Sequence, residues 1–221
     1  MTTSETHSHV GVGRPAPDFT LPAIGSNGTV SLGDYRGRSP ILLALFRGLY
    51  CPFCRRAIAQ LGVTSEKLQQ LGVETLAIVA TSVENARLYF RFRPTRAPLA
   101  ADHDLITHRA YGLPHPPVTP EMMEVMQKTR INPTGELPAP VPIAEVGEAL
   151  DKVQGYTPTE VDRKDAERQF PQLKGQFLVD RDGIVRWANV ECATEGLAGL
   201  GKFPTEEQLV EAARAAAPLR P

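Results

Sequence analysis

The sequence predicts an α/β fold in which a mixed sheet carries helices on both of its faces. In the first half of the chain, short apolar runs alternate with segments whose apolar residues recur at helical spacing. Later, two apolar segments flank an Asp-Gly turn and are followed by one more helical segment. The chain has 221 residues, of which 42% are hydrophobic and 22% charged, so it is long enough for an ordinary globular core.

The first expected strand covers residues 41–46, an unbroken apolar run typical of a strand buried on both faces. A helix is expected over residues 54–71, where apolar residues recur on one helical face and Gly72 follows as a stop signal. Residues 73–80 form a second apolar run. This β-α-β order predicts two parallel strands joined by a helix.

Thr81 and Glu84 have the spacing of a capping box, which predicts the start of a second helix that Pro94 must end. Residues 99–101 are expected as a short strand. A helical turn that ends at 111–112 follows this strand.

A β-hairpin is predicted by strands at 177–180 and 184–188 around the turn at 181–183. Thr205 with Gln208 then caps the final helix.

One part of the chain is unusually rich in proline. Eight of the 20 prolines fall between Pro114 and Pro142. A long proline-rich stretch inside a domain is usually functional or mobile. We expect a single domain over residues 10–217, preceded by a flexible tail at 1–9 and interrupted by an insertion at about 114–171. Short helical segments are expected inside the insertion at 121–131, 145–154 and 159–170.

Charge and hydropathy exclude several functions. With 24 basic and 25 acidic side chains the formal net charge is −1, which argues against a nucleic-acid partner. No apolar run reaches the roughly 18 residues of a membrane span. The N-terminal residues lack the charged-then-apolar pattern of an export signal, so a cytoplasmic location is expected. Neither a metal nor another cofactor is expected.

The strongest chemical signal is a Cys-x-x-Cys pair, Cys51 and Cys54, between the first strand and the first helix. At a helix N-terminus, unpaired backbone N–H groups and the helix dipole favour a thiolate. Arg47, Arg55 and Arg56 add positive charge beside the pair. Since a thiolate attacks disulfides and peroxides, the motif indicates sulfur redox chemistry.

The pair has two other interpretations. It could be half of a zinc site, but Cys192 and five scattered histidines offer no second paired ligand spacing. It could also be an inert buried pair, although three neighbouring arginines suit an apolar pocket poorly. Cys192 itself is expected to be a small buried or idle cysteine.

Other tempting residues have plainer interpretations. Trp187 and Phe177 are expected to pack on the sheet. His7 and His9 lie in the tail. The Asp102-His103-Asp104 cluster is expected to cap a helix rather than hold a metal. The methionines at 122, 123 and 126 fall at helical spacing, and we expect local packing there, with a partner or substrate surface as the alternative.

Four segments resemble the peroxiredoxin-like branch of the thioredoxin superfamily, the alkyl hydroperoxide reductase/thiol-specific antioxidant type. They are Gly-Arg-Pro-Ala-Pro-Asp-Phe-Thr-Leu at 13–21, Val-Ser-Leu-Gly-Asp-Tyr-Arg-Gly at 30–37, the stretch from Ala-Asp at 101–102 to Ala-Tyr-Gly at 110–112, and Lys-Gly-Gln-Phe-Leu-Val-Asp-Arg-Asp-Gly-Ile-Val-Arg at 174–186. The resemblance covers about residues 11–112 and 174–217. It implies a thioredoxin-like fold of peroxiredoxin type, and the insertion is unmatched.

The site departs from the family pattern. Aligned strand ends place Cys54 where the family has its peroxide-attacking cysteine, with Cys51 in place of a Thr and Arg47 in place of a Pro. Lys174 stands where the family has a thiolate-supporting arginine, which keeps the charge but not the two-pronged geometry. Thioredoxins carry a proline just before the hairpin strand, where this chain has Gly175-Gln176 and Pro171 lies too far back.

Two mechanisms follow. In the first, Cys54 attacks a peroxide and Cys51 resolves the sulfenic acid, which makes the protein an antioxidant peroxidase. We place this mechanism slightly ahead because the surrounding motifs are peroxiredoxin-like. In the alternative, Cys51 attacks a substrate disulfide and Cys54 releases it. Arg47, Arg55 and Lys174 are the expected thiolate-supporting residues. Both mechanisms require an external thiol reductant such as a thioredoxin or glutathione system. A homodimer is possible, and a redox sensor without turnover is a third reading.

Overall fold

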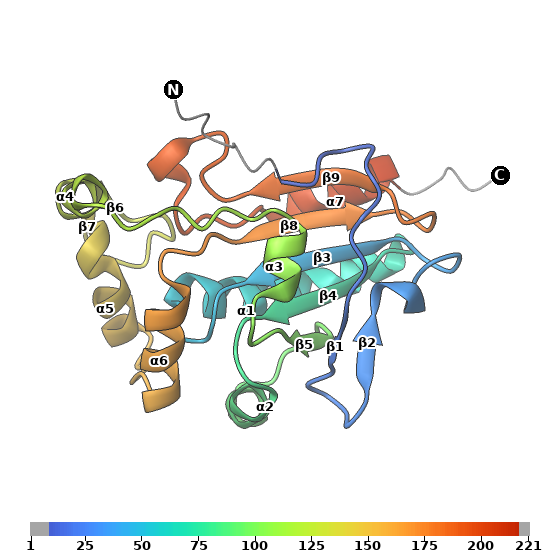
Figure 1. The fold of residues 1–221 in the computed structure, drawn as a ribbon, viewed down its shortest axis with the longest axis horizontal. Helices are drawn as coiled ribbons and strands as arrows, with labels where there is room; N and C mark the ends of the chain where they lie inside the picture. The colour runs from blue at the N-terminus through green and yellow to red at the C-terminus, as the bar shows by residue number, and fades with distance from the viewer. Residues whose placement is uncertain (1–8, 217–221) are drawn as a thin grey trace.

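A five-stranded mixed sheet forms the centre of the structure, a computed structural model that describes residues 9–216 (Figure 1). Its strand order is β5-β4-β3-β8-β9, in which β3, β4 and β5 are parallel and β8 and β9 are antiparallel to their neighbours. The strands are β3 (Ile41–Phe46), β4 (Glu74–Val79), β5 (Leu99–Ala101), β8 (Gly175–Val179) and β9 (Val185–Val190). The predicted mixed sheet is therefore confirmed.

Every side chain of β3 is buried because the strand lies in the middle of the sheet with core on both faces. Leu42, Ala44 and Phe46 join one apolar cluster with helix residues. The alternate residues 41, 43 and 45 join a second cluster with the N-terminal segment and Tyr111. The alternation follows from the two-residue period of a strand.

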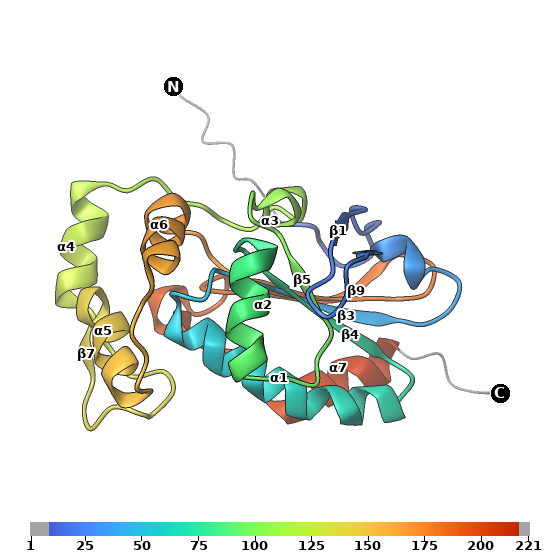
Figure 2. The ribbon, with the colours of Figure 1, turned by 90° about the horizontal axis from the view of Figure 1, so that it is seen from below.

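Helices cover both faces of the sheet (Figures 1 and 2). On one face lie α1 (Pro52–Gln70) and α7 (Glu206–Ala216). On the other lies α3 (Ile106–Ala110), near a two-stranded sheet of β1 (Thr20–Pro22) and β2 (Thr29–Ser31) that the sequence did not indicate. The helix α2 (Val83–Phe92) packs beside β5.

The proline-rich segment forms three helices and a short antiparallel pair at the end of the sheet where β3 leads into the cysteines (Figures 1 and 2). Its elements are α4 (Pro120–Lys128), β6 (Arg130–Ile131), β7 (Val141–Pro142), α5 (Ile143–Val153) and α6 (Glu160–Gln169). The first expected helix, 121–131, was too long, because Arg130 and Ile131 pair with β7 as a strand. Helices were correctly expected near α5 and α6.

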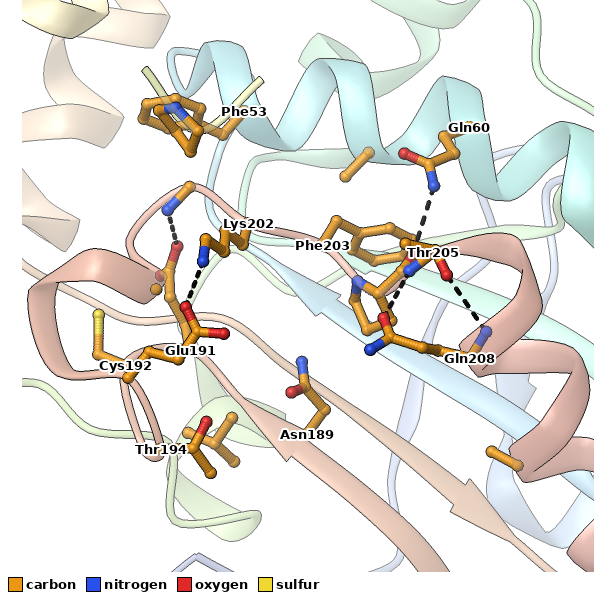
Figure 3. A pocket seen from close by; sticks show the side chains of 18 of the residues that line it. Phe53, Gln60, Asn189, Glu191, Cys192, Thr194, Lys202, Phe203, Thr205 and Gln208 are labelled. Atoms are coloured by element: carbon orange, nitrogen blue, oxygen red, sulfur yellow. Dashed lines mark hydrogen bonds and ion pairs between the residues drawn. The ribbon is translucent and has the colours of Figure 1, made fainter. Parts of the chain in front are cut away.

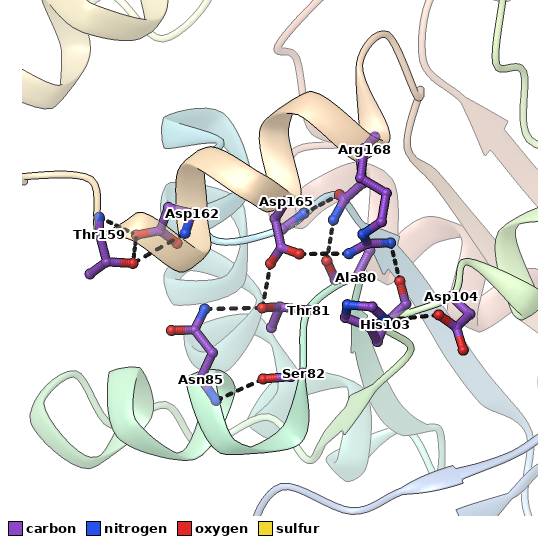
Figure 4. A network of polar contacts seen from close by, with 12 residues as sticks. Ala80, Thr81, Ser82, Asn85, His103, Asp104, Thr159, Asp162, Asp165 and Arg168 are labelled. Atoms are coloured by element: carbon purple, nitrogen blue, oxygen red, sulfur yellow. Dashed lines mark hydrogen bonds and ion pairs between the residues drawn. The ribbon is translucent and has the colours of Figure 1, made fainter.

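A polar network joins α6 to the ends of β3 and β4 (Figure 4). Asp165 accepts a hydrogen bond from the Thr81 hydroxyl at 2.6 Å and one from Arg168 at 2.6 Å. The Gln169 amide accepts from the Gly48 N–H at 2.8 Å and donates to the Ala80 carbonyl. Because Thr81, Asp165 and Gln169 are buried, the network fixes α6 beside the loop that carries the cysteines.

Thr81 does not cap α2, so the predicted Thr81–Glu84 capping box is wrong. Ser82 caps the helix instead, with its hydroxyl accepting from the Asn85 N–H at 3.2 Å. The helix ends at Phe92, before Pro94 as expected.

Two other predicted caps are present. Thr205 and Gln208 bond each other's backbone N–H groups. The Asp102 carboxylate accepts from the N–H groups of Ile106 and Thr107, at 3.0 and 2.8 Å. The predicted hairpin is confirmed as β8 and β9. Of the expected tail, residues 1–8, with His7, lie outside the described residues.

Candidate redox site

Cys51 and Cys54 lie at the junction of β3 and α1, as the sequence predicted. Cys51 is the N-cap of α1, and its Sγ accepts a hydrogen bond from the backbone N–H of Cys54 at 3.2 Å. Pro52 occupies the first helical turn, where the missing N–H costs nothing. Both cysteines are free thiols. The helix N-terminus therefore directs a hydrogen-bond donor at the sulfur of Cys51.

The two sulfurs differ in access. Cys54 is fully buried, whereas Cys51, although only 4% exposed, lines an open pocket of about 580 Å³. Cys54 does not line this pocket. The sequence placed Cys51 at an exposed helix entrance, and the structure instead recesses it in the wall of a pocket. Of the two sulfurs, only that of Cys51 can be reached from this pocket.

Three charged side chains gather beneath the cysteines. Glu191, which follows β9, is buried, and its Oε1 lies 3.2 Å from Nη2 of Arg47 and 3.1 Å from Nζ of Lys174. The same oxygen accepts a hydrogen bond from the Gly201 N–H at 2.8 Å. Two cations against one anion leave a net positive charge in this buried cluster. Arg47 and Lys174, two of the three residues expected to support a thiolate, both belong to this cluster.

These charges separate the two thiols in pKa. Burial opposes ionisation of Cys51, but a hydrogen bond from Cys54 and the charges of Arg47 and Lys174 outweigh it and lower the Cys51 pKa to about 5. Burial, reinforced by the neighbouring Cys51, raises the pKa of Cys54 well above its usual value. At neutral pH the pair therefore carries one thiolate, on Cys51.

Arg55 does not have the role expected for it. Its guanidinium donates to the Leu49 carbonyl at 2.8 Å and to Gln154 at 2.9 Å, and it pairs with Asp151. It also stacks 3.8 Å from the ring centre of Tyr156. Arg55 therefore joins α1 to the insertion, and Arg47 and Lys174 are the cations that act on Cys51.

Sequence reasoning missed Glu191. A single acid after an apolar strand carries little signal, and its partners lie far along the chain. Burial raises the pKa of Glu191, but the charges of Arg47 and Lys174 lower it to below its usual value. The Glu191 side chain is therefore a carboxylate at neutral pH.

The pocket beside Cys51 is closed on its far side by the insertion. Residues from α4, α5 and the 170–173 segment line it: Met122, Val125, Met126, Ile143, Ala144, Val146, Gly147, Phe170, Pro171, Gln172 and Leu173. Pro171, which follows a cis peptide bond and lies too far back in the chain to match the thioredoxin proline, lines the pocket with Cys51. Met122 and Met126 also line it, and Met126 in addition packs against the core, as the expectation of local packing had it.

A second, more polar pocket of about 810 Å³ lies on the other side of Phe53, between α1, α7 and the segment after β9 (Figure 3). Glu191, Lys202 and Trp187 line it, so Trp187 does more than pack on the sheet. Phe177, by contrast, is fully buried in the core, as expected.

Cys192 lines both pockets and is half-buried, and burial raises its pKa to about 11. It is neither sealed in the core nor activated as a thiolate. Within residues 9–216, no cluster of three or more His, Cys, Asp and Glu side chains could hold a metal. In the same range, every helix is too short or too polar to cross a membrane.

The family model of the AhpC/TSA family matches residues 12–188. The chain belongs to the AhpC/TSA family. No curated protein matches this AhpC/TSA chain.

Solved structures share its fold at low identity. Peroxidoxin BcpB from Mycobacterium tuberculosis is 13% identical with a TM-score of 0.57, and covers 96% of this chain and 100% of its own. The reduced 2-Cys peroxiredoxin of Plasmodium vivax is 15% identical with a TM-score of 0.56, and the match covers 92% of this chain and 94% of that one. A Chlorobium tepidum protein assigned as the thiol:disulfide interchange protein DsbE is 19% identical with a TM-score of 0.52, covering 92% and 99%. The predicted thioredoxin-like fold of peroxiredoxin type is confirmed.

Proposed function

We propose that this protein is a thiol–disulfide exchange enzyme in which Cys51 attacks the substrate and Cys54 resolves the product. One observation carries the proposal: of the two cysteines, Cys51 alone lines the pocket, and it is the one whose pKa is lowered. This arrangement reverses the order implied by the family alignment, in which Cys54 attacks first.

The proposed cycle has two exchange steps. The Cys51 thiolate attacks one sulfur of a disulfide R–S–S–R′, forming Cys51–S–S–R and releasing R′–S⁻, which takes a proton from water. Cys54 then loses its proton and attacks the Cys51 sulfur, which releases R–S⁻. The substrate disulfide gains two electrons, and the enzyme dithiol becomes a Cys51–Cys54 disulfide. An external dithiol or thiol reductant, such as a thioredoxin or glutathione system, must reopen it.

The buried cations also affect the reduction potential of the cysteine pair. Because Arg47 and Lys174 stabilise the Cys51 thiolate, they make Cys51 a good leaving group when the Cys51–Cys54 disulfide is attacked. A thiolate stabilised in the reduced form makes the disulfide more oxidising. We therefore expect a potential above the roughly −270 mV of thioredoxin.

Peroxide reduction is the second candidate, and a specific feature favours it. Nε of Arg47 is buried, has no hydrogen-bond partner, and belongs to a residue that lines the pocket with Cys51. Such a donor could stabilise the oxygen that leaves when the Cys51 thiolate attacks a hydroperoxide. The attack gives Cys51 sulfenic acid and an alcohol or water. Cys54 then displaces water to form the same disulfide.

A single-turnover comparison tests both candidates. Reduced wild type, Cys51→Ser and Cys54→Ser are mixed separately with a model disulfide and with hydrogen peroxide, quenched with acid and identified by mass. Exchange predicts that Cys54→Ser stops at a Cys51 mixed disulfide and that Cys51→Ser does not react. Fast sulfenic acid formation with peroxide in Cys54→Ser, without mixed disulfide, would favour the peroxidase. Attack by Cys54 in the Cys51→Ser variant would contradict the assignment of the nucleophile.

A further inference from the structure

The composition of the pocket beside Cys51 restricts what can approach the sulfur. Its volume of about 580 Å³ suits a small molecule. Besides the Cys51 thiolate, Arg47 is the one lining residue with a charged side chain. Its Nη1 already bonds the Gln172 carbonyl at 3.1 Å and its Nη2 pairs with Glu191, so its charge is balanced and only Nε is left as a donor. An anionic substrate would therefore lose water without gaining an unbalanced cation, which is unfavourable.

The helix α4 supplies the apolar side of this pocket. None of its residues is buried, although Met122, Val125 and Met126 face the pocket. Glu124 and Lys128 pair with each other on the exposed surface of the same helix. On the face towards the pocket, Met122 and Met126 are half-buried and Val125 is exposed, so an apolar ligand would cover the part that the protein leaves exposed. Methionine side chains adapt to ligands of different shape, so this face suits flexible aliphatic groups.

The depth of Cys51 argues for a small substrate rather than a protein. The side chain is 4% exposed, and the pocket is bounded opposite it by the insertion. A disulfide in a folded protein would have to bring its flanking chains into the pocket to reach the sulfur. A small organic disulfide needs no such space.

We propose that this pocket selects small organic disulfides with uncharged aliphatic substituents, and that the inner face of α4 makes the selection. The proposal rests on the exchange function above and specifies its substrate class. The reaction is the balanced exchange already given, in which R and R′ are alkyl groups. Charged disulfides such as oxidised glutathione are then poor substrates.

Three probes test this selection in single turnovers of the reduced protein: dipropyl disulfide, bis(2-hydroxyethyl) disulfide and oxidised glutathione. Each rate is divided by the rate of the same disulfide with dithiothreitol in solution, which removes differences in intrinsic reactivity. We expect the normalised rate to be at least about tenfold higher for dipropyl disulfide than for oxidised glutathione, the scale on which a pocket discriminates small groups. Equal normalised rates, or equally fast reduction of insulin, would overturn the proposal.

Two variants of α4 test its role. Val125→Glu places a charge in the pocket at a residue that is 41% exposed, and Met123→Glu places the same charge on the same helix at a residue that is 38% exposed and outside the pocket. Val125→Glu should reduce the preference for dipropyl disulfide to within about threefold, and Met123→Glu should keep it. Equal effects of the two variants would overturn the role of α4. Because the two residues are similarly exposed, both variants should fold equally well, and thermal melts of both variants check this.

The two proposals fail separately. If the reduced wild type reacts with none of the three disulfides, the exchange function is wrong, and if Cys51→Ser reacts as fast as wild type, Cys51 is not the nucleophile. If the reaction depends on Cys51 but shows no preference for the alkyl disulfide, only the substrate class is wrong.

Discussion

Replacing Glu191 by Gln tests the charge cluster beneath the cysteines. The substitution keeps the size of the side chain and an oxygen that can accept from the Gly201 N–H. It removes the negative charge that lies 3.2 Å from Arg47 and 3.1 Å from Lys174. The Lys174 side chain is 1% exposed and that of Arg47 11%, so water cannot replace the lost partner.

The two attractions set the size of the effect. At these distances and an effective dielectric constant of about 20, each is worth about 5 kcal/mol. Much of this sum offsets the cost of burying the carboxylate, and removing one partner from a buried ion pair usually costs about 3–5 kcal/mol. For a chain of this size such a loss lowers the melting temperature by about 6–20 °C.

Urea and thermal unfolding of the reduced protein measure this loss. Glu195→Gln is the matched control, because Glu195 pairs with Lys202 at the surface, where both side chains are about half exposed. The control should lose less than about 1 kcal/mol. If Glu191→Gln is no less stable than Glu195→Gln, the buried cluster does not contribute as argued.

Three further predictions concern the thiolate, a loop glycine and the insertion. The rate at which iodoacetamide alkylates Cys51 should rise with a midpoint near pH 5 instead of near 9. Because the folded protein holds this thiol at a lower pKa than the unfolded chain, its contribution to stability is full above about pH 9 and is lost as pH falls towards 5. Gly201→Ala should cost about 1–3 kcal/mol in urea unfolding, because the new Cβ would lie 2.8 Å from the Phe53 ring at a φ of +80°. Arg55→Met should speed chymotrypsin cleavage within residues 114–171, because it breaks the buried link to the insertion.

Each of these has its own control. Cys51→Ser should lose the pH-dependent stability between pH 5 and 9. Gly13→Ala has a φ of +84° but open space around the new Cβ, so an equal loss in both glycine variants would refute the steric argument. Arg96→Met removes a surface pair with Glu66 and should leave cleavage unchanged. A similar increase in cleavage for both arginine variants would show that the Arg55 link is not what holds the insertion.

The sequence alone determined the features that depend on residues close together in the chain. The apolar run at Ile41–Phe46, the Thr205–Gln208 cap and the turn between β8 and β9 are set by neighbours within a few positions. The same holds for the cysteine pair, because a Cys-x-x-Cys that opens a helix places the first sulfur at its N-terminus. Thr81 shows the limit: it has the local pattern of a cap, but a carboxylate 84 residues away takes its hydroxyl.

Only the tertiary structure shows which cysteine lines the pocket and has the lowered pKa. The answer depends on Glu191, Arg47 and Lys174, and the Arg47–Glu191 pair alone spans 144 residues. Counting back from the hairpin turn would not have paired Lys174 with Glu191, because a bulge at Leu178/Val179 shifts the register by one residue. The effect of a charge depends on its distance from the sulfur and on how deeply both are buried, and a one-residue shift in register changes the distance and the burial. The sequence therefore specifies a redox motif, while the packing decides which of its two sulfurs has the lower pKa.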